Sequence, residues 1–174
     1  CGSVGSVVAE LLVRNGITEF NLYDDDIIEP HNLGNQLFTA MDIGRHKTKA
    51  LSERMLAINS ECDITCHDRY EPGQRISGYV FLCIDNIETR KAICESVRYN
   101  MNVKARAADW RDPNAVGNLI ASMDFTHEEA MAEMPTTACG QTVGLMSVVM
   151  LVSAIGVDNF ITFIKCKQYK SCIL

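Results

Sequence analysis

The pattern of apolar and polar positions predicts helices that alternate with strands along the first half of the chain. Apolar side chains recur at helical spacing over residues 5–14 and again over residues 45–59. Residues 18–23 alternate polar and apolar side chains, and residues 78–84 form a dense apolar run, so we predict a strand in each segment. Strands separated by helices of this length favour right-handed crossovers and a mostly parallel sheet.

The second half of the chain continues this alternation less regularly. A helix is predicted over residues 88–99, and a long apolar helix over residues 141–156. Short strands are predicted at residues 63–66, 103–108 and 118–123. We therefore expect one α/β domain with a Rossmann-like, mostly parallel sheet and helices on both faces.

The first residues form a glycine-containing turn with no strand before it. The chain opens Cys1-Gly2-Ser3-Val4-Gly5. A turn of this kind normally follows a buried strand that begins the domain. We expect the first strand of the sheet to lie upstream of Cys1, so that it is missing from the N-terminus of this sequence.

Charge and composition disfavour several classes of protein. The 174 residues include 16 Lys and Arg and 22 Asp and Glu, a formal net charge of −6, so the chain lacks the basic footprint of a nucleic-acid-binding domain. The longest apolar stretch, residues 142–157, is shorter than the about 20 residues of a membrane span and predicts a buried core helix. The opening residues do not resemble a signal peptide. We expect a cytoplasmic protein with no nucleic-acid or membrane partner.

The eight cysteines include no C-x-x-C pair, so the sequence does not favour a structural zinc site. We expect most of them to be buried and reduced. Cys139 comes immediately before the apolar helix, whose N-terminal dipole would favour a thiolate. It is the candidate for thioester or persulfide formation, although a small core residue at a helix start explains the same position.

The glycine turn and a later acidic residue together predict a nucleotide site. Gly2 and Gly5 allow the backbone to approach a phosphate, and the helix that follows offers free N–H groups and a positive dipole end. Asp24 stands 19 residues after Gly5, at the end of the next predicted strand. An acidic residue at this separation accepts a ribose hydroxyl in dinucleotide-binding folds. The pattern favours an adenosine nucleotide.

Two further residues have both a functional and a structural explanation. Asp85 follows the predicted strand at residues 78–84, where a carboxylate can hold Mg²⁺ through one oxygen or simply cap the next helix. Lys47 lies near a helix N-terminus, which the helix dipole disfavours. A bound phosphate would explain this lysine, and so would a solvated side chain beside Lys49.

Five blocks of residues, in this order, resemble the ThiF/MoeB/HesA family, which includes the adenylation domains of ubiquitin-activating enzymes. The resemblance covers residues 1 to 95 and the late apolar helix, while residues 105–140 diverge, so we expect a single ThiF-like adenylation domain over residues 1–174. The blocks are Gly2 to Gly5, Asp24 to Glu29, Asn32 to Gln36, Asp42 to Gly44 with Lys47, and Ile84 to Asn86 with Thr89 and Arg90.

The resemblance implies a reaction. Proteins of this family use ATP and Mg²⁺ to adenylate the C-terminal carboxylate of a small ubiquitin-like or sulfur-carrier protein, and they pair as homodimers or pseudo-dimers. By position, Asp24 would bind the ribose, Asp85 would hold Mg²⁺, and Lys47 would contact the phosphates. The resemblance assigns the rest of the nucleotide site to Gly2, Ser3, Gly5, Asp26, Asn32, Gln36, Asn86 and Arg90.

One position departs from the family pattern. Asn35 stands where the family commonly has an arginine that contacts the triphosphate. Removal of a charge-assisted contact of this kind costs about 1.5–3 kcal/mol. Either Arg45 or a basic residue of a partner chain compensates, or catalysis at a site that contains Asn35 is weak.

Two other functions stay open. An NAD-dependent oxidoreductase would use the glycine turn and Asp24 in the same way, but it gives no role to Lys47 or Asp85. A catalytically weakened ThiF-like protein would bind a ubiquitin-like partner without turnover, and the loss of the arginine at position 35 would fit that function.

Overall fold

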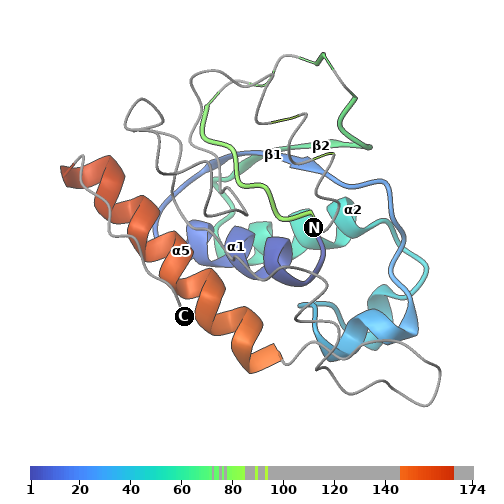
Figure 1. Cartoon of the computed structure of the whole chain (residues 1–174). Coiled ribbons are helices and arrows are strands. Elements are labelled where there is room, and N and C mark those ends of the chain that lie inside the picture. Colours follow the sequence, from blue (N-terminus) through green and yellow to red (C-terminus); the bar gives the residue numbers. More distant parts are fainter. Residues whose placement is uncertain are drawn as a thin grey trace. The chain divides into compact units, whose positions relative to one another are not determined.

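The computed structural model describes residues 1–71, 73, 74, 76, 78–84, 89, 93 and 146–166. The helices and strands are α1 (Ser3–Arg14), β1 (Glu19–Tyr23), α2 (Lys47–Ile58), β2 (Asp63–His67) and α5 (Met146–Cys166) (Figure 1). Two 3-10 turns, η1 (Pro30–Gly34) and η2 (Ala40–Asp42), lie between β1 and α2. The chain divides into two compact units, Cys1–Glu71 with Gly144–Ala154, and Pro72–Val143 with Ile155–Leu174.

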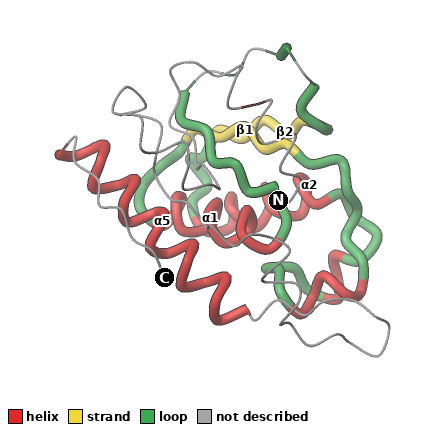
Figure 2. The backbone as a smooth tube through the Cα atoms, in the orientation of Figure 1, coloured by secondary structure: helices red, strands yellow, loops and turns green. Residues whose placement is uncertain are grey.

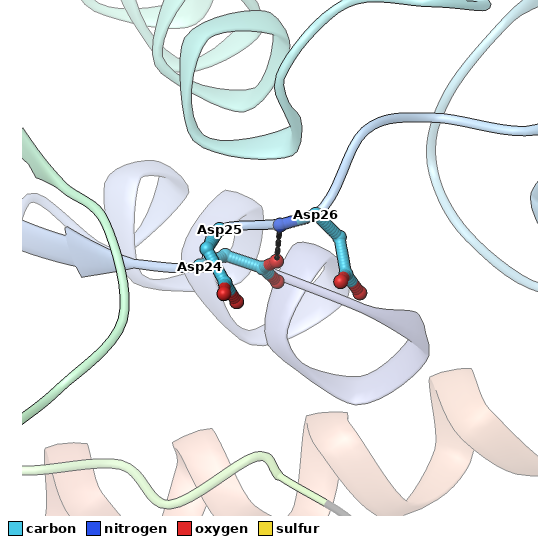
Figure 3. Close-up of side chains that lie close together, drawn as sticks. All are labelled: Asp24, Asp25 and Asp26. Carbon is cyan, nitrogen blue, oxygen red and sulfur yellow. Dashed lines mark hydrogen bonds between the residues drawn. The ribbon is translucent and has the colours of Figure 1, made fainter.

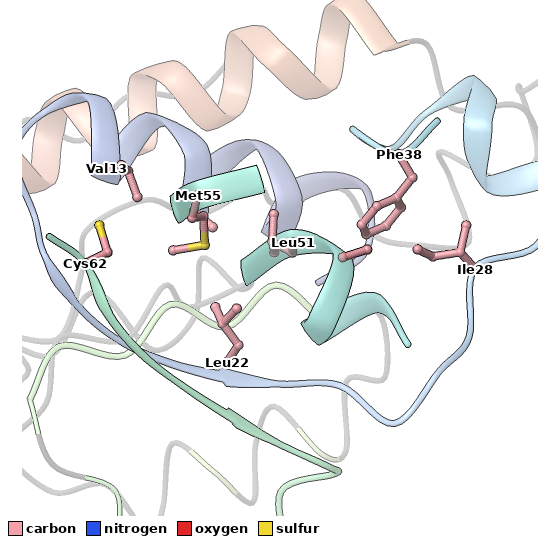
Figure 4. Packing of buried hydrophobic residues seen from close by; sticks show 9 residues of the cluster. Val13, Leu22, Ile28, Phe38, Leu51, Met55 and Cys62 are labelled. Atoms are coloured by element: carbon pink, nitrogen blue, oxygen red, sulfur yellow. The ribbon is translucent and has the colours of Figure 1, made fainter. Parts of the chain in front are cut away.

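In the first unit, β1 and β2 form a parallel pair, as the sequence predicts (Figure 2). The register runs from Glu19 opposite Asp63 to Tyr23 opposite His67. Parallel neighbours need a crossover connection, and α2 provides it. Together with α1, this helix covers one face of the strand pair (Figure 4).

The core of this unit forms where the apolar stripes of the two helices meet the strands. Leu51 and Met55 lie one turn apart on α2 and are fully buried in a cluster that also contains Val13 of α1 and Leu22 of β1 (Figure 4). Phe38 and Ile28 extend the same cluster under the loop between β1 and α2. This packing fixes the loop that carries most of the predicted site.

Predictions for the rest of the chain have mixed outcomes. Residues 78–84 contain one isolated bridge residue, Val80, rather than the expected strand. The described residues do not include the residue that pairs with Val80. Of the helix predicted at residues 88–99, Thr89 and Ile93 are described and are helical. The rest of that helix and the strands predicted at residues 103–108 and 118–123 fall outside the described residues.

The apolar helix near the C-terminus is longer than predicted. It spans Met146–Cys166, because the apolar pattern continues past residue 156 with Asp158 and Lys165 as its only charged residues. Its segment Val149–Cys166 is long and apolar enough to cross a membrane by length and composition, with a mean hydropathy of 1.6. In the second unit Phe160 is buried and makes edge-on contacts with two aromatic rings, Tyr79 and Phe81.

A carboxylate joins the two helices that cover the strand pair. Glu10 of α1 accepts hydrogen bonds from Arg54 of α2 (2.6 Å) and from Arg14 one turn further along α1 (2.9 Å). Burial raises the pKa of Glu10, but the hydrogen bonds and charges of the two arginines outweigh it, so its pKa lies below the ordinary value. The ionised carboxylate therefore stabilises the α1–α2 contact.

Replacement of Glu10 by Gln should lower the free energy of unfolding by about 1 kcal/mol at pH 7, because the arginines are partly exposed and the ion pairs are screened by water. A lowered folded-state pKa gives stability that is present above the ordinary pKa and is lost as the pH falls through the folded-state value. The difference between wild type and variant should therefore narrow as the pH falls below the ordinary glutamate pKa of about 4.3. Urea unfolding at pH 7 and at pH 3.5 measures both quantities.

The matched control is Glu53→Gln, which breaks an exposed ion pair with Arg45. We expect this variant to change the free energy of unfolding by less than about 0.5 kcal/mol at pH 7. Equal losses in the two variants would contradict the assigned role of Glu10.

Candidate functional site

The glycine turn opens directly into the first helix. Gly2 is the N-cap of α1, and Ser3 and Gly5 lie in its first turn. The first intrahelical bond runs from the N–H of Ser6 to the carbonyl of Gly2 (2.9 Å), so the N–H groups of residues 3 to 5 come before the helical hydrogen-bonding pattern. The first turn contains no acidic residue. This end of α1 therefore offers backbone donors and a positive dipole to an anion.

Asp24 lies beside this turn, as the nucleotide prediction requires. The nitrogen of Cys1 donates to Asp24 Oδ2 (2.7 Å), and the N–H of Asp26 donates to Asp24 Oδ1 (3.0 Å; Figure 3). The Asp24 side chain is 13% exposed. The structure thus brings the carboxyl end of β1 to the start of α1, which is the arrangement that would hold a ribose near the phosphates.

Lys47 is a buried residue, so the interpretation as a solvated lysine is wrong. Its side chain is 9% exposed, and its ammonium donates to Asp26 Oδ2 (2.6 Å). The backbone N–H of Lys47 also donates to the carbonyl of Asp26 (3.0 Å). The hydrogen bond from Lys47 holds the pKa of Asp26 below its usual range. Lys49, by contrast, is exposed.

The polar loop between β1 and α2 is organised by Asn32. This residue is buried, and its side-chain oxygen accepts the N–H of Glu29 (2.9 Å) while its backbone carbonyl accepts the N–H of Gln36 (3.0 Å). Asn32 therefore shapes the loop, and its side-chain oxygen already has a donor. Leu37 is tied to α1, because its N–H donates to the hydroxyl of the fully buried Ser6 (3.3 Å).

Two side-chain oxygens in this loop are closed to solvent and have no donor. They are Asn35 Oδ1 and Gln36 Oε1. A buried acceptor without a partner costs about 1–3 kcal/mol. Such atoms need an explanation, and a ligand group that supplies a hydrogen bond is one. A triphosphate carries only acceptor oxygens, so a donor for these two atoms would have to come from a hydroxyl, an N–H group or water.

Arg45 is engaged elsewhere. Its guanidinium donates to Asp42 Oδ1 (3.1 Å) and forms an ion pair with Glu53. Asp42 in turn accepts hydrogen bonds from Thr39 and closes the turn η2. These contacts give Arg45 a structural role and do not favour it as a replacement for the arginine missing at position 35.

Three carboxylates lie close together at the end of β1, with ligand atoms of Asp24, Asp25 and Asp26 within 4.8 Å of one another (Figure 3). Cations of the chain balance two of them, since Arg69 Nε lies 3.1 Å from Asp25 and Lys47 pairs with Asp26. Two of the three carboxylates therefore have a cationic partner within the described residues, and Asp25 is held by Arg69 rather than by Lys47.

Other site predictions fall outside the described residues. These are Asp85 with its Mg²⁺, Asn86 and Arg90 in the nucleotide site, and the thiol of Cys139. Their roles stay predictions.

Some side-chain contacts between β1 and β2 were not predicted from the sequence. The rings of Tyr23 and His67 stack with centroids 4.3 Å apart, because the strand register places these residues opposite each other. His67 Nε2 also lies 2.8 Å from Asn21 Oδ1. The alternation in residues 18–23 puts Tyr23 on the face of the sheet away from Leu22, but only the register identifies its partner.

Comparison with known proteins identifies the family. A sequence model of the ThiF family matches residues 1–103. The tRNA threonylcarbamoyladenosine dehydratase of Haemophilus influenzae is 35% identical over 142 residues, which cover 75% of this chain and 53% of that protein. Ubiquitin-like modifier-activating enzyme 5 of Dictyostelium discoideum is 33% identical over 110 residues, which cover 53% of this chain and 29% of that protein. The chain thus spans about half of the first relative and less than a third of the second.

Solved structures share the fold. The E. coli dehydratase TcdA in complex with AMP has a TM-score of 0.61 and 18% identity, and the match covers 95% of this chain and 83% of that one. E. coli MccB with MccA-N7isoASN has a TM-score of 0.67 and 19% identity, with 97% and 56% covered. Because the family model covers more than half of the residues and these neighbours share its fold, the chain belongs to the ThiF family.

Proposed function

We propose that this chain binds ATP and adenylates a carboxylate at the carboxyl ends of β1 and β2. The observation that carries the proposal is the position of Asp24 at the end of β1 beside the start of α1, with the buried Lys47 paired to Asp26 (2.6 Å) two residues further along (Figure 3). Membership of the ThiF family and the AMP bound by the neighbour TcdA support it.

Each part of the site matches a part of the nucleotide. The carboxylate of Asp24 can accept a ribose hydroxyl, and the first-turn N–H groups of α1 can donate to phosphate oxygens. Lys47 supplies a positive charge, and the side-chain NH2 groups of Asn35 and Gln36 could donate to phosphate oxygens. We propose that Asp85 holds Mg²⁺, which would neutralise phosphate charge, and that Asn86 and Arg90 belong to the nucleotide site.

The reaction follows from this arrangement. A carboxylate oxygen of the substrate attacks the α-phosphorus, the bond from that phosphorus to the oxygen bridging to the β-phosphate breaks, and pyrophosphate leaves with the electron pair. The products are an acyl-adenylate and pyrophosphate. Displacement at phosphorus is accelerated mainly by positioning and by fixed charges where negative charge develops. Here the backbone donors of α1 and the ammonium of Lys47 are held in place before the nucleotide binds.

The substrate we propose is the C-terminal carboxylate of a small ubiquitin-like or sulfur-carrier protein. The relatives support two classes of substrate, because one is named as a ubiquitin-like modifier-activating enzyme and another as a tRNA-modifying dehydratase. The net charge of −6 favours a protein over an RNA, since RNA binding depends on basic surface. Cys139 is the proposed acceptor of the acyl group, and a cytoplasmic homodimer is the proposed assembly.

Exchange of labelled pyrophosphate into ATP tests this function. In the presence of a candidate carrier that ends in Gly-Gly, we expect the wild-type chain to catalyse exchange and Asp85→Ala to lose it by about 100-fold or more, because the variant removes the proposed metal ligand. Asp158→Ala, on an exposed position of α5, is the matched control and should exchange like wild type.

Other results of this experiment would each point to a different conclusion. Exchange by Asp85→Ala at the wild-type rate would show that the metal assignment is wrong. Carrier binding without exchange in any variant would support the catalytically weakened protein. Binding of NAD(H) in place of ATP would support the oxidoreductase.

The charge of Lys47 should matter more than the amide of Asn35. Lys47→Met removes a charge-assisted contact and should weaken ATP binding by tenfold or more, whereas Asn35→Ala removes at most a neutral hydrogen bond and should weaken it by about two- to fivefold. Calorimetric titration with ATP and Mg²⁺ measures both affinities. Equal losses would mean that Asn35 has taken over a larger share of phosphate binding than its chemistry suggests.

A further inference from the structure

We infer that Asp26 is a positioning residue, which acts through Lys47 by holding its ammonium at the rim of the site where the nucleotide phosphates bind. The inference rests on the proposed function. It gives Asp26 and Asp24 different roles, because Asp24 would contact the nucleotide while Asp26 would act on a neighbouring side chain.

The backbone around the pair makes Asp26 a fixed support. Asp26 accepts both the ammonium of Lys47 (2.6 Å) and its backbone N–H (3.0 Å). Next to this double contact, Ile28 exchanges two backbone hydrogen bonds with the segment before α2, from its N–H to Arg45 (2.8 Å) and from Gly44 to its carbonyl (2.8 Å). An antiparallel bridge joins Ile27 to His46. The end of β1 is therefore tied to the start of α2 at several points.

The positive charge of Lys47 needs the carboxylate of Asp26 beside it. A cation at a helix N-terminus meets the positive end of the helix dipole, and the buried stem of Lys47 limits its contact with water. The carboxylate of Asp26 offsets both penalties. Its own pKa is lowered by the hydrogen bond from Lys47, so it stays ionised at neutral pH.

The pair joins a buried cation to an exposed carboxylate at the end of β1. The Lys47 side chain is 9% exposed, while that of Asp26 is 60% exposed. Asp26 also donates its N–H to Asp24, which places the pair next to the proposed ribose site (Figure 3). An ammonium has three N–H donors, and one bond to Asp26 leaves donors for phosphate oxygens.

A double-mutant cycle on nucleotide binding tests the inference in the full chain. Affinities for ATP and for AMP are measured by calorimetry for wild type, Asp26→Asn, Lys47→Met and the double variant. We expect Asp26→Asn to weaken ATP binding by about tenfold and AMP binding by less than twofold, because AMP lacks the β- and γ-phosphates. In the Lys47→Met background, the same change should alter ATP affinity by less than twofold, since Asp26 then has no ammonium to hold.

Two further variants separate positioning from a structural effect. Asp25→Asn makes the same chemical change at the next residue, which pairs with Arg69, and should leave ATP affinity within twofold of wild type. Asp26→Glu keeps the charge and should recover part of the lost affinity. If Asp26→Asn does not fold, judged by its thermal unfolding midpoint, the cycle is run with Asp26→Glu and an intermediate loss is expected.

Several results would overturn the inference. Additive losses in the cycle would mean that Asp26 does not act through Lys47. Tighter ATP binding by Asp26→Asn would mean that the carboxylate competes with the phosphates. Pyrophosphate exchange measured in parallel distinguishes the two proposals: a wild-type chain that binds ATP without exchange contradicts the proposed function alone, and one that binds no ATP contradicts both.

Discussion

A parallel pair of strands constrains the chain between them more than any single contact does. Because β1 and β2 run in the same direction, α2 has to run back along the sheet, and its N-terminus must lie near the carboxyl ends of the strands. The N-terminus of α1 lies at the same edge, since Cys1 contacts Asp24 at the end of β1. Two positive helix ends and the acidic end of a strand are thus brought together by topology alone.

Periodicity in the sequence predicts this framework well. The predicted helices at residues 5–14 and 45–59 correspond to Ser3–Arg14 and Lys47–Ile58, and the predicted strand at 18–23 corresponds to Glu19–Tyr23. These elements are predictable because each buries one face against a shared core. Residues 78–84 are harder to predict, since the pairing that turns an apolar run into a strand is not specified by the apolar pattern itself.

The side-chain partners in the site depend on information that periodicity does not contain. The position of Asp24 beside the glycine turn was predictable, because a fold-level spacing rule places it there. The Lys47–Asp26 pair was not, because it depends on the register between the segment after β1 and the segment before α2, which is set by backbone hydrogen bonds in irregular structure. The same holds for Arg45, whose partners Asp42 and Glu53 come from a turn and from the next helix.

The framework of helices and strands differs from the candidate site in how favourable its local interactions are. In the framework, local preference and packing agree: Leu51 and Met55 are fully buried, and Glu10 joins two arginines across α1 and α2. Near the carboxyl ends of the strands, several groups are in locally unfavourable positions. A lysine stands at a helix N-terminus, three carboxylates lie close together, and two amide oxygens lack donors. A folded chain keeps such unfavourable features where a ligand offsets them. Their concentration at one edge is independent of the family resemblance, and it points to the same place.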